Sequence, residues 1–250
     1  MNVKLVIAIL IMAFKLTATY AQYPFEKHKA IQYKEYSDWR ETESEQQNGV
    51  YEHVLIVPDF FANGENLKLK LTSYASNWDS SFVSVYRNNK LLQRQFEPMR
   101  LLPPNIIEPV RVADINGDGM KDIKMVVPYM GNGLAALNVR VIYLFQKHNH
   151  TFNKISFLDK MGENRVERDF NGDGNYEIIT MNLNGHKNHN YWTFNLYNYG
   201  NGTLKNVNDK YGYPIMVQYL YRDNHKVTDK IDRATMKQFA MELPEEFDKR

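Results

Sequence analysis

The sequence predicts an all-β protein of repeated antiparallel multi-strand units, arranged like the blades of a β-propeller that need not close, with a short C-terminal helix. Two acidic loops follow the same pattern and begin 55 residues apart, at positions 114 and 169. Short runs rich in β-branched and aromatic residues follow each loop, and such runs favour strands. A period of this size is typical of a repeated multi-strand unit such as a propeller blade.

Residues 1–21 have the pattern of a signal peptide. Lys4 precedes an apolar run from Leu5 to Phe14, and the segment ends in Thr19-Tyr20-Ala21 with a small residue at the expected cleavage site. An uncleaved anchor is the alternative, but this run is much shorter than the roughly 20 residues that span a bilayer. We therefore expect a periplasmic or secreted protein with no transmembrane segment in the mature chain.

Charge and cysteine content exclude several classes of function for this chain. The chain has 31 basic and 29 acidic residues, and removing the leader with Lys4 and Lys15 leaves 29 of each. A mature chain of zero formal charge lacks the basic footprint of a nucleic-acid-binding protein. The chain has no cysteine, which excludes thiol nucleophiles, disulfides and zinc-thiolate sites.

The mature chain divides into three parts. Residues 22–49 are polar and charged and are expected to form a mobile lead-in. Residues 50–225 form the expected β-repeat domain, in which the run from Leu67 to Thr72 alternates apolar and polar residues as a half-buried strand does. A weak copy of the unit, without alternating acids around Asn63-Gly64, is expected to be metal-free. Residues 226–250 form a tail with a helix expected from Asp229 to Leu243.

Each acidic loop reads D-x-N-x-D-G-x-x-[DE]. Oxygen-bearing side chains at loop positions 1, 3 and 5 suit a loop folded around Ca²⁺, and the glycine at position 6 permits a sharp turn. The carbonyl at position 7 and the acid at position 9 can complete the shell. The expected ligands are Asp114, Asn116, Asp118, Met120 and Asp122 in the first loop, and Asp169, Asn171, Asp173, Asn175 and Glu177 in the second.

These loops differ from those of helix–loop–helix calcium proteins. Position 12 is Met125 in one loop and Thr180 in the other, so neither supplies the glutamate that such hands require. Apolar β-branched runs follow both loops, so we expect loop-to-strand sites that bind two calcium ions in all. The alternative is a pair of metal-free turns, because Asn, Asp and Gly favour turns in any case.

Similarity between the two regions continues beyond the loops. Each is followed by an Asn-Gly turn, an aromatic-rich strand and a second turn that ends in Thr, at Thr151 and Thr203. The repeats therefore extend over about 110–160 and 165–207. These units resemble FG-GAP/VCBS-type repeats, which form propeller blades and carry such calcium loops. The chain is also similar in architecture to small periplasmic propeller-like proteins, some of which inhibit cell-wall lysozymes.

Aromatic residues are abundant, and their default role is packing in and between strands. An exposed aromatic cluster would instead suit a sugar-binding or protein-binding face. Tyr191, Trp192, Tyr197 and Tyr199 are the candidates for such a face.

Motifs of catalysis are absent from the sequence: it has no G-x-S-x-G, no H-E-x-x-H and no phosphate-binding glycine loop. We therefore expect a non-enzymatic module that binds an extracytoplasmic protein or glycan. One alternative is an inhibitor or immunity protein for a cell-wall hydrolase, with a protruding loop at 131–134 or 185–190. Another is a polysaccharide-acting enzyme with two facing carboxylates, for which Glu52, Glu97, Glu163 and Glu167 are unassigned.

Overall fold

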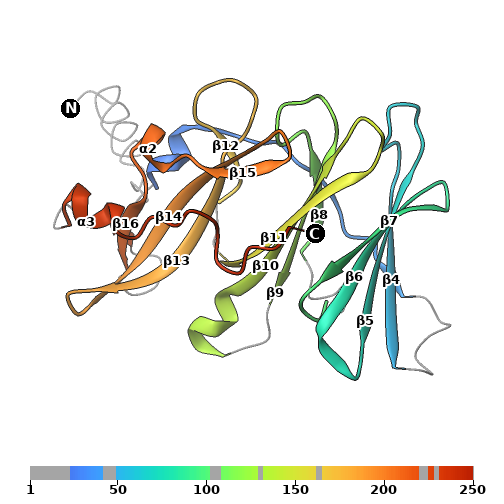
Figure 1. Ribbon diagram of the computed structural model, residues 1–250, viewed down its shortest axis with the longest axis horizontal. Helices are drawn as coiled ribbons and strands as arrows, with labels where there is room; N and C mark the ends of the chain where they lie inside the picture. The colour runs from blue at the N-terminus through green and yellow to red at the C-terminus, as the bar shows by residue number, and fades with distance from the viewer. Residues whose placement is uncertain are drawn as a thin grey trace, which may run out of the picture.

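The computed structural model describes residues 23–41, 49–101, 108–128, 132–161, 165–219, 225–227 and 231–249. These residues form mostly β-strands in antiparallel sheets (Figure 1). The all-β expectation is confirmed. The predicted leader, residues 1–21, lies outside the described residues.

The first sheet is formed mainly by a four-stranded meander. Its strand order is β3-β4-β5-β6-β7, with β3 (Arg40–Glu41), β4 (Val50–Val57), β5 (Leu67–Tyr74), β6 (Asn77–Arg87) and β7 (Lys90–Glu97). The predicted alternation in β5 is confirmed, because Leu67, Leu69 and Leu71 are buried and the lysines between them are partly exposed.

The second sheet carries the first acidic loop. Its order is β11-β10-β9-β8-β2, with β2 (Lys34–Tyr36), β8 (Val110–Ala113), β9 (Asp122–Pro128), β10 (Asn138–Gln146) and β11 (Phe152–Lys160). The 3₁₀ helix η3 (Gly133–Leu137) precedes β10. The acidic loop joins β8 to β9, and so connects neighbouring strands.

The third sheet follows the second acidic loop. It contains β13 (Ile178–His186), β14 (His189–Gly200), β15 (Thr203–Asn206), β16 (Ile215–Tyr219) and β17 (His225–Val227), with β14 paired to β13, β15 and β16. The short helix α2 (Asn208–Tyr211) lies between β15 and β16. The strand before the loop, β12 (Arg168–Asp169), pairs with β1 (Lys29–Ala30) in a separate two-stranded sheet.

The second sheet lies between the other two and is buried on both faces. In β10, Ile142 and Leu144 pack into a core shared with the first sheet, whereas Val141 and Tyr143 pack into a core shared with the third. Successive side chains of a strand point to opposite faces, so alternate residues of β10 enter different cores. This explains why the strand is almost continuously apolar and buried.

The expected mobile lead-in is instead an ordered strap over residues 23–41. It begins with the 3₁₀ helix η1 (Pro24–Lys27), in which Phe25 is fully buried. Its strands β1, β2 and β3 pair with β12, β8 and β4 in turn, so the blue segment in Figure 1 runs from the two-stranded sheet to the second and then the first sheet. The pairings with β8 and β4 satisfy backbone groups of strands that would otherwise be sheet edges. Residues 42–48 lie outside the described residues.

The C-terminal tail contains a helix, as expected, but a shorter one. Helix α3 (Arg233–Lys237) begins after Asp232, whose side chain accepts a hydrogen bond from the Thr235 N–H at 2.7 Å. The chain then returns to the second sheet, where Ser156 and Asp248 exchange backbone hydrogen bonds of 2.9 and 2.8 Å. The tail therefore belongs to the folded body. No helix among the described residues is long and apolar enough to cross a membrane.

Candidate functional site

The first acidic loop, residues 114–122, is organised around Asp114. One carboxylate oxygen of Asp114 accepts the Gly117 N–H at 2.8 Å, and the other accepts the Gly119 N–H at 2.8 Å. The Asn116 amide donates to the Asp118 carboxylate at 3.0 Å. The side chain at position 1 thus stabilises the turn that brings positions 3 and 5 together.

The second acidic loop, residues 169–177, has the same pattern of hydrogen bonds. The Asp169 carboxylate accepts the Gly172 N–H at 2.6 Å and the Gly174 N–H at 3.1 Å. The Asn171 amide donates to Asp173 at 2.7 Å. In both loops the backbone N–H at position 7 donates to the carboxylate at position 5. These hydrogen bonds run from Met120 to Asp118 at 2.8 Å and from Asn175 to Asp173 at 2.9 Å.

Glycines at positions 4 and 6 make this conformation accessible. All four have φ between 74° and 84°, a region that favours glycine: Gly117, Gly119, Gly172 and Gly174. The two loops therefore share backbone conformation as well as side-chain pattern.

The acids at position 9 are buried and anchor the loops to the fold. Asp122 accepts the Ile115 N–H at 3.0 Å and the Gln146 N–H, from the end of β10, at 2.9 Å. Glu177 accepts the N–H at position 2 of its own loop at 3.0 Å and the Tyr211 hydroxyl, from α2, at 2.9 Å. Each acid thus closes the base of its loop and ties it to a neighbouring element.

Burial and neighbouring carboxylates disfavour the charged form of these two acids. The pKa of Asp122 is raised to about 7, chiefly by burial, and the negative charges of Asp118 and Asp114 act in the same direction. Burial also raises the pKa of Glu177, with a further contribution from Asp173. A divalent cation in either loop would offset both the lost hydration and the repulsion among carboxylates.

The two loops contact one another directly, near the upper edge of Figure 1. The Tyr176 N–H of the second loop donates to the Ile115 carbonyl of the first at 2.9 Å. A Cβ atom added to Gly117 would lie 3.0 Å from the backbone of Gly174. The structure therefore joins two loops that are 55 residues apart in the sequence.

The donor set of each loop fits calcium, whereas the side chains do not converge as a complete shell. Carboxylate, amide and carbonyl oxygens are the ligands that calcium takes, six to eight at a time. Within the described ranges, no three His, Asp or Glu side chains gather closely enough to hold a metal ion. The carboxylates instead accept the hydrogen bonds given above.

The four aromatic residues expected on a binding surface are buried. Tyr191, Trp192, Tyr197 and Tyr199 are at most 4% exposed. They belong to β14, which is paired on both sides and covered on both faces, so they pack in the cores. The sequence shows an aromatic strand but does not show how many layers cover it.

Partly exposed aromatic rings lie on the first sheet instead. Tyr74, Phe82 and Phe96 form edge-to-face pairs with ring centroids 6.4 and 5.8 Å apart. The Arg94 guanidinium lies 3.9 Å from the centre of the Phe82 ring. The alternation of β6 could have indicated this row, because Phe82 occupies the face opposite the buried Val83 and Val85.

Three of the glutamates to which the sequence analysis assigned no role lie among the described residues, and each forms an ion pair. Glu52 pairs with Lys70 at 2.6 Å on the first sheet. Glu97 is fully buried and pairs with Arg140 at 2.7 Å and Lys154 at 2.9 Å. These contacts join strands and sheets and give both acids a structural role.

Glu167 forms a second buried cluster near β12. Its carboxylate accepts from Lys124 at 2.6 Å, from the Tyr33 hydroxyl at 2.5 Å, and from the Tyr143 hydroxyl. Burial alone would raise the pKa of Glu167, but the Lys124 charge and these donors outweigh it and lower the pKa. The fourth unassigned acid, Glu163, lies outside the described residues.

Comparison with models of protein families, with curated proteins and with solved structures finds no match to this chain.

Proposed function

We propose that this chain is an exported calcium-binding β-repeat protein that acts as a non-catalytic binding module for an extracytoplasmic protein or glycan. The observation that carries the proposal is the shared construction of the two acidic loops. They have the same oxygen donors at positions 1, 3 and 5 and the same positive-φ glycines. Each also has a buried acid at position 9, Asp122 or Glu177. Each loop also follows the first strand of its region, β8 or β12.

The proposed role of calcium is to stabilise the junction between sheets. In the first loop the ligands are Asp114, Asn116, Asp118, the Met120 carbonyl and Asp122. In the second they are Asp169, Asn171, Asp173, the Asn175 carbonyl and Glu177. Because the loops contact one another and anchor to β10 and α2, a cation in either would order elements of the second and third sheets together. When bound, calcium supplies positive charge and fixed oxygen geometry.

A propeller-like arrangement belongs to the same proposal. The meanders β4–β7 and β8–β11 are equivalent four-stranded units, and β12–β15 is a third unit whose first strand pairs with the strap. The strap strands β3, β2 and β1 pair with β4, β8 and β12, the first strand of each unit. Two equivalent meanders, and a third unit whose preceding strand also pairs with the strap, support an open, blade-like array.

Calorimetric titration with Ca²⁺ and thermal unfolding test the proposal. One ligand at about 100 times its dissociation constant adds about 2.7 kcal/mol, or roughly 5–10 °C for a domain of this size. We expect calcium to raise the unfolding temperature by at least this amount relative to excess chelator. Asp118→Asn and Asp173→Asn should each weaken one of two binding sites.

The matched control is Asp79→Asn, which removes the same charge from an exposed position outside both loops. This variant should bind calcium as the unaltered protein does. A protein that neither binds calcium nor gains thermal stability from it would refute the proposal and leave two metal-free turns. Glycan-array binding that is present with calcium and lost with chelator would support the module function.

A further inference from the structure

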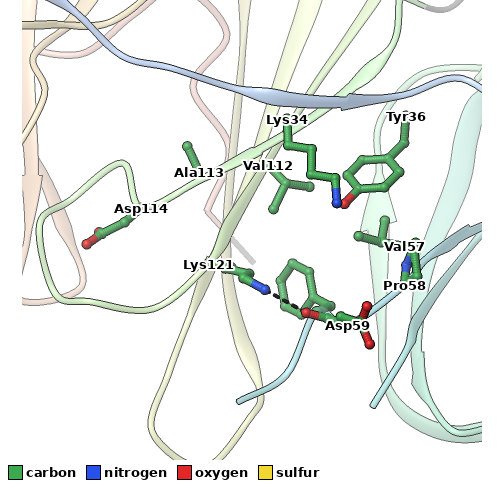
Figure 2. Close-up of a pocket in the computed structure, with 10 residues that line it drawn as sticks. Lys34, Tyr36, Val57, Pro58, Asp59, Val112, Ala113, Asp114 and Lys121 are labelled. Atoms are coloured by element: carbon green, nitrogen blue, oxygen red, sulfur yellow. Dashed lines mark hydrogen bonds between the residues drawn. The ribbon is translucent and has the colours of Figure 1, made fainter. Parts of the chain in front are cut away.

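A cavity of about 290 Å³ lies where the strap, the first sheet and the first acidic loop meet (Figure 2). Its walls come from β2, from the end of β4 and the turn after it, and from β8 with the loop that follows. Ligand sites commonly occupy about 300–1,000 Å³ and often lie between structural units. A cavity at the lower end of that range fits one sugar ring or a small acid.

The floor of the cavity is apolar. Val57, Phe60 and Val112 line it and are buried in the core between the first and second sheets. The partly buried ring of Tyr36 stands at one side, as Figure 2 shows. An aromatic ring beside an apolar floor can pack against the C–H face of a pyranose while its polar edge stays hydrated.

Two lysines bring positive charge to the rim. Lys34 is exposed, and its ammonium group lies 5.3 Å from the centre of the Tyr36 ring. Lys121 is also exposed and donates to the Asp59 carbonyl at 2.6 Å. In the part of the chain that the structure describes, neither lysine forms an ion pair with a carboxylate. Both ammonium groups retain donors for an anionic ligand.

The rim also offers an acceptor. Asp59 follows β4, is exposed and is one of the residues that line the cavity. A carboxylate can accept hydrogen bonds from the hydroxyl groups of a ligand, which a fatty acid lacks. Asp114 also lines the cavity, but the proposed calcium ion offsets its charge, so two lysines against Asp59 leave one excess positive charge, which favours a ligand of net negative charge over a zwitterion.

We propose that this cavity binds a sugar acid: a pyranose that carries one carboxylate, either free or as the exposed residue of an acidic glycan. Lys34 and Lys121 receive the carboxylate, Tyr36 packs against the ring, and Asp59 accepts from hydroxyl groups. This inference rests on the proposed binding function and names its ligand class. Because Asp114 and Lys121 belong to the first acidic loop, the cavity also adjoins the proposed calcium site.

The test is an NMR titration of the whole protein with D-glucuronate at saturating calcium, followed through backbone amide shifts. We expect saturable shifts at the cavity residues and at least tenfold weaker binding of D-glucose. Lys34→Gln and Lys121→Gln should each raise the dissociation constant roughly three- to tenfold, because each removes a charge-assisted hydrogen bond at an exposed site. Both lysines are exposed, so the variants keep the apolar core.

Lys90→Gln is the matched control, because Lys90 is exposed at the start of β7, outside the cavity. It should bind D-glucuronate as the unaltered protein does. Equal binding of D-glucose, D-glucose 6-phosphate or phenylalanine would overturn the sugar-acid inference, and so would an absence of binding. If calcium still raises the unfolding temperature in that case, the proposed calcium function stands while the cavity inference fails.

Discussion

Replacing Glu97 with glutamine should destabilise the protein strongly, because Glu97 forms ion pairs with two buried cations. Its carboxylate accepts from Arg140 at 2.7 Å, Lys154 at 2.9 Å and Ser156 at 3.0 Å. The side chains of Arg140 and Lys154 are 1% and 0% exposed. Lys154 also pairs with a second carboxylate, that of Asp248 in the C-terminal tail, at 2.8 Å. The Glu97→Gln variant therefore leaves two buried cations with one well-placed carboxylate.

Removing one partner of a buried ion pair costs about 3–5 kcal/mol. For a protein of this size that corresponds to a fall of roughly 6–20 °C in unfolding temperature. Urea unfolding at pH 7 and fixed calcium concentration measures the free energy directly. The matched control is Glu35→Gln, because the Glu35 side chain is 52% exposed and lies 3.0 Å from Arg111. An exposed pair of this kind contributes about 1 kcal/mol or less.

A loss in free energy of unfolding no larger in Glu97→Gln than in Glu35→Gln would refute this prediction. That result would mean that water reaches Arg140 and Lys154, or that the tail moves to supply the missing charge. A loss of several kcal/mol in Glu97→Gln alone would locate a main electrostatic contact between the first and second sheets at the end of β7.

Three further predictions concern a loop contact, a buried hydroxyl and pH. Gly117→Ala should lower the free energy of unfolding by about 1–3 kcal/mol, a larger loss than that of Gly119→Ala. Both positions have positive φ, but only at Gly117 would a Cβ atom lie 3.0 Å from the second loop. Equal losses in urea unfolding would contradict the loop contact. Tyr143→Phe should lower the free energy of unfolding by about 1.5–3 kcal/mol in the same assay, because it removes a hydroxyl donor to the buried Glu167 carboxylate. An unchanged free energy would contradict this and indicate that water replaces the hydroxyl. Burial lowers the pKa of His53 below its usual 6.5, so the unfolded chain takes up a proton at His53 before the folded protein does as pH falls. Between pH 7 and pH 5 the unaltered protein should therefore lose stability relative to His53→Gln, and a difference between the two that does not change with pH would refute this.

Local sequence patterns determined individual strands and the two acidic loops. The alternation of Leu67, Leu69 and Leu71 predicted a strand with one buried face, and that strand is β5. The acidic pattern predicted two equivalent loops followed by strands, and the hydrogen bonds of Asp114 and Asp169 are equivalent. These features are readable because strand alternation and turn glycines act within a few residues.

Long-range contacts decided the rest. The polar segment 23–41 shows no strand period, yet its strands pair with β4 of the first sheet, β8 of the second sheet and β12, because these strands have free backbone groups. Tyr191 and Trp192 are buried because β14 is covered on both faces, and the partners of Glu97 come from strands 43 or more residues away. A sequence shows which side chains carry charge or apolar surface. Which groups they meet depends on the packing of segments far apart in the chain, and that packing also forms the cavity between Lys34 and Lys121.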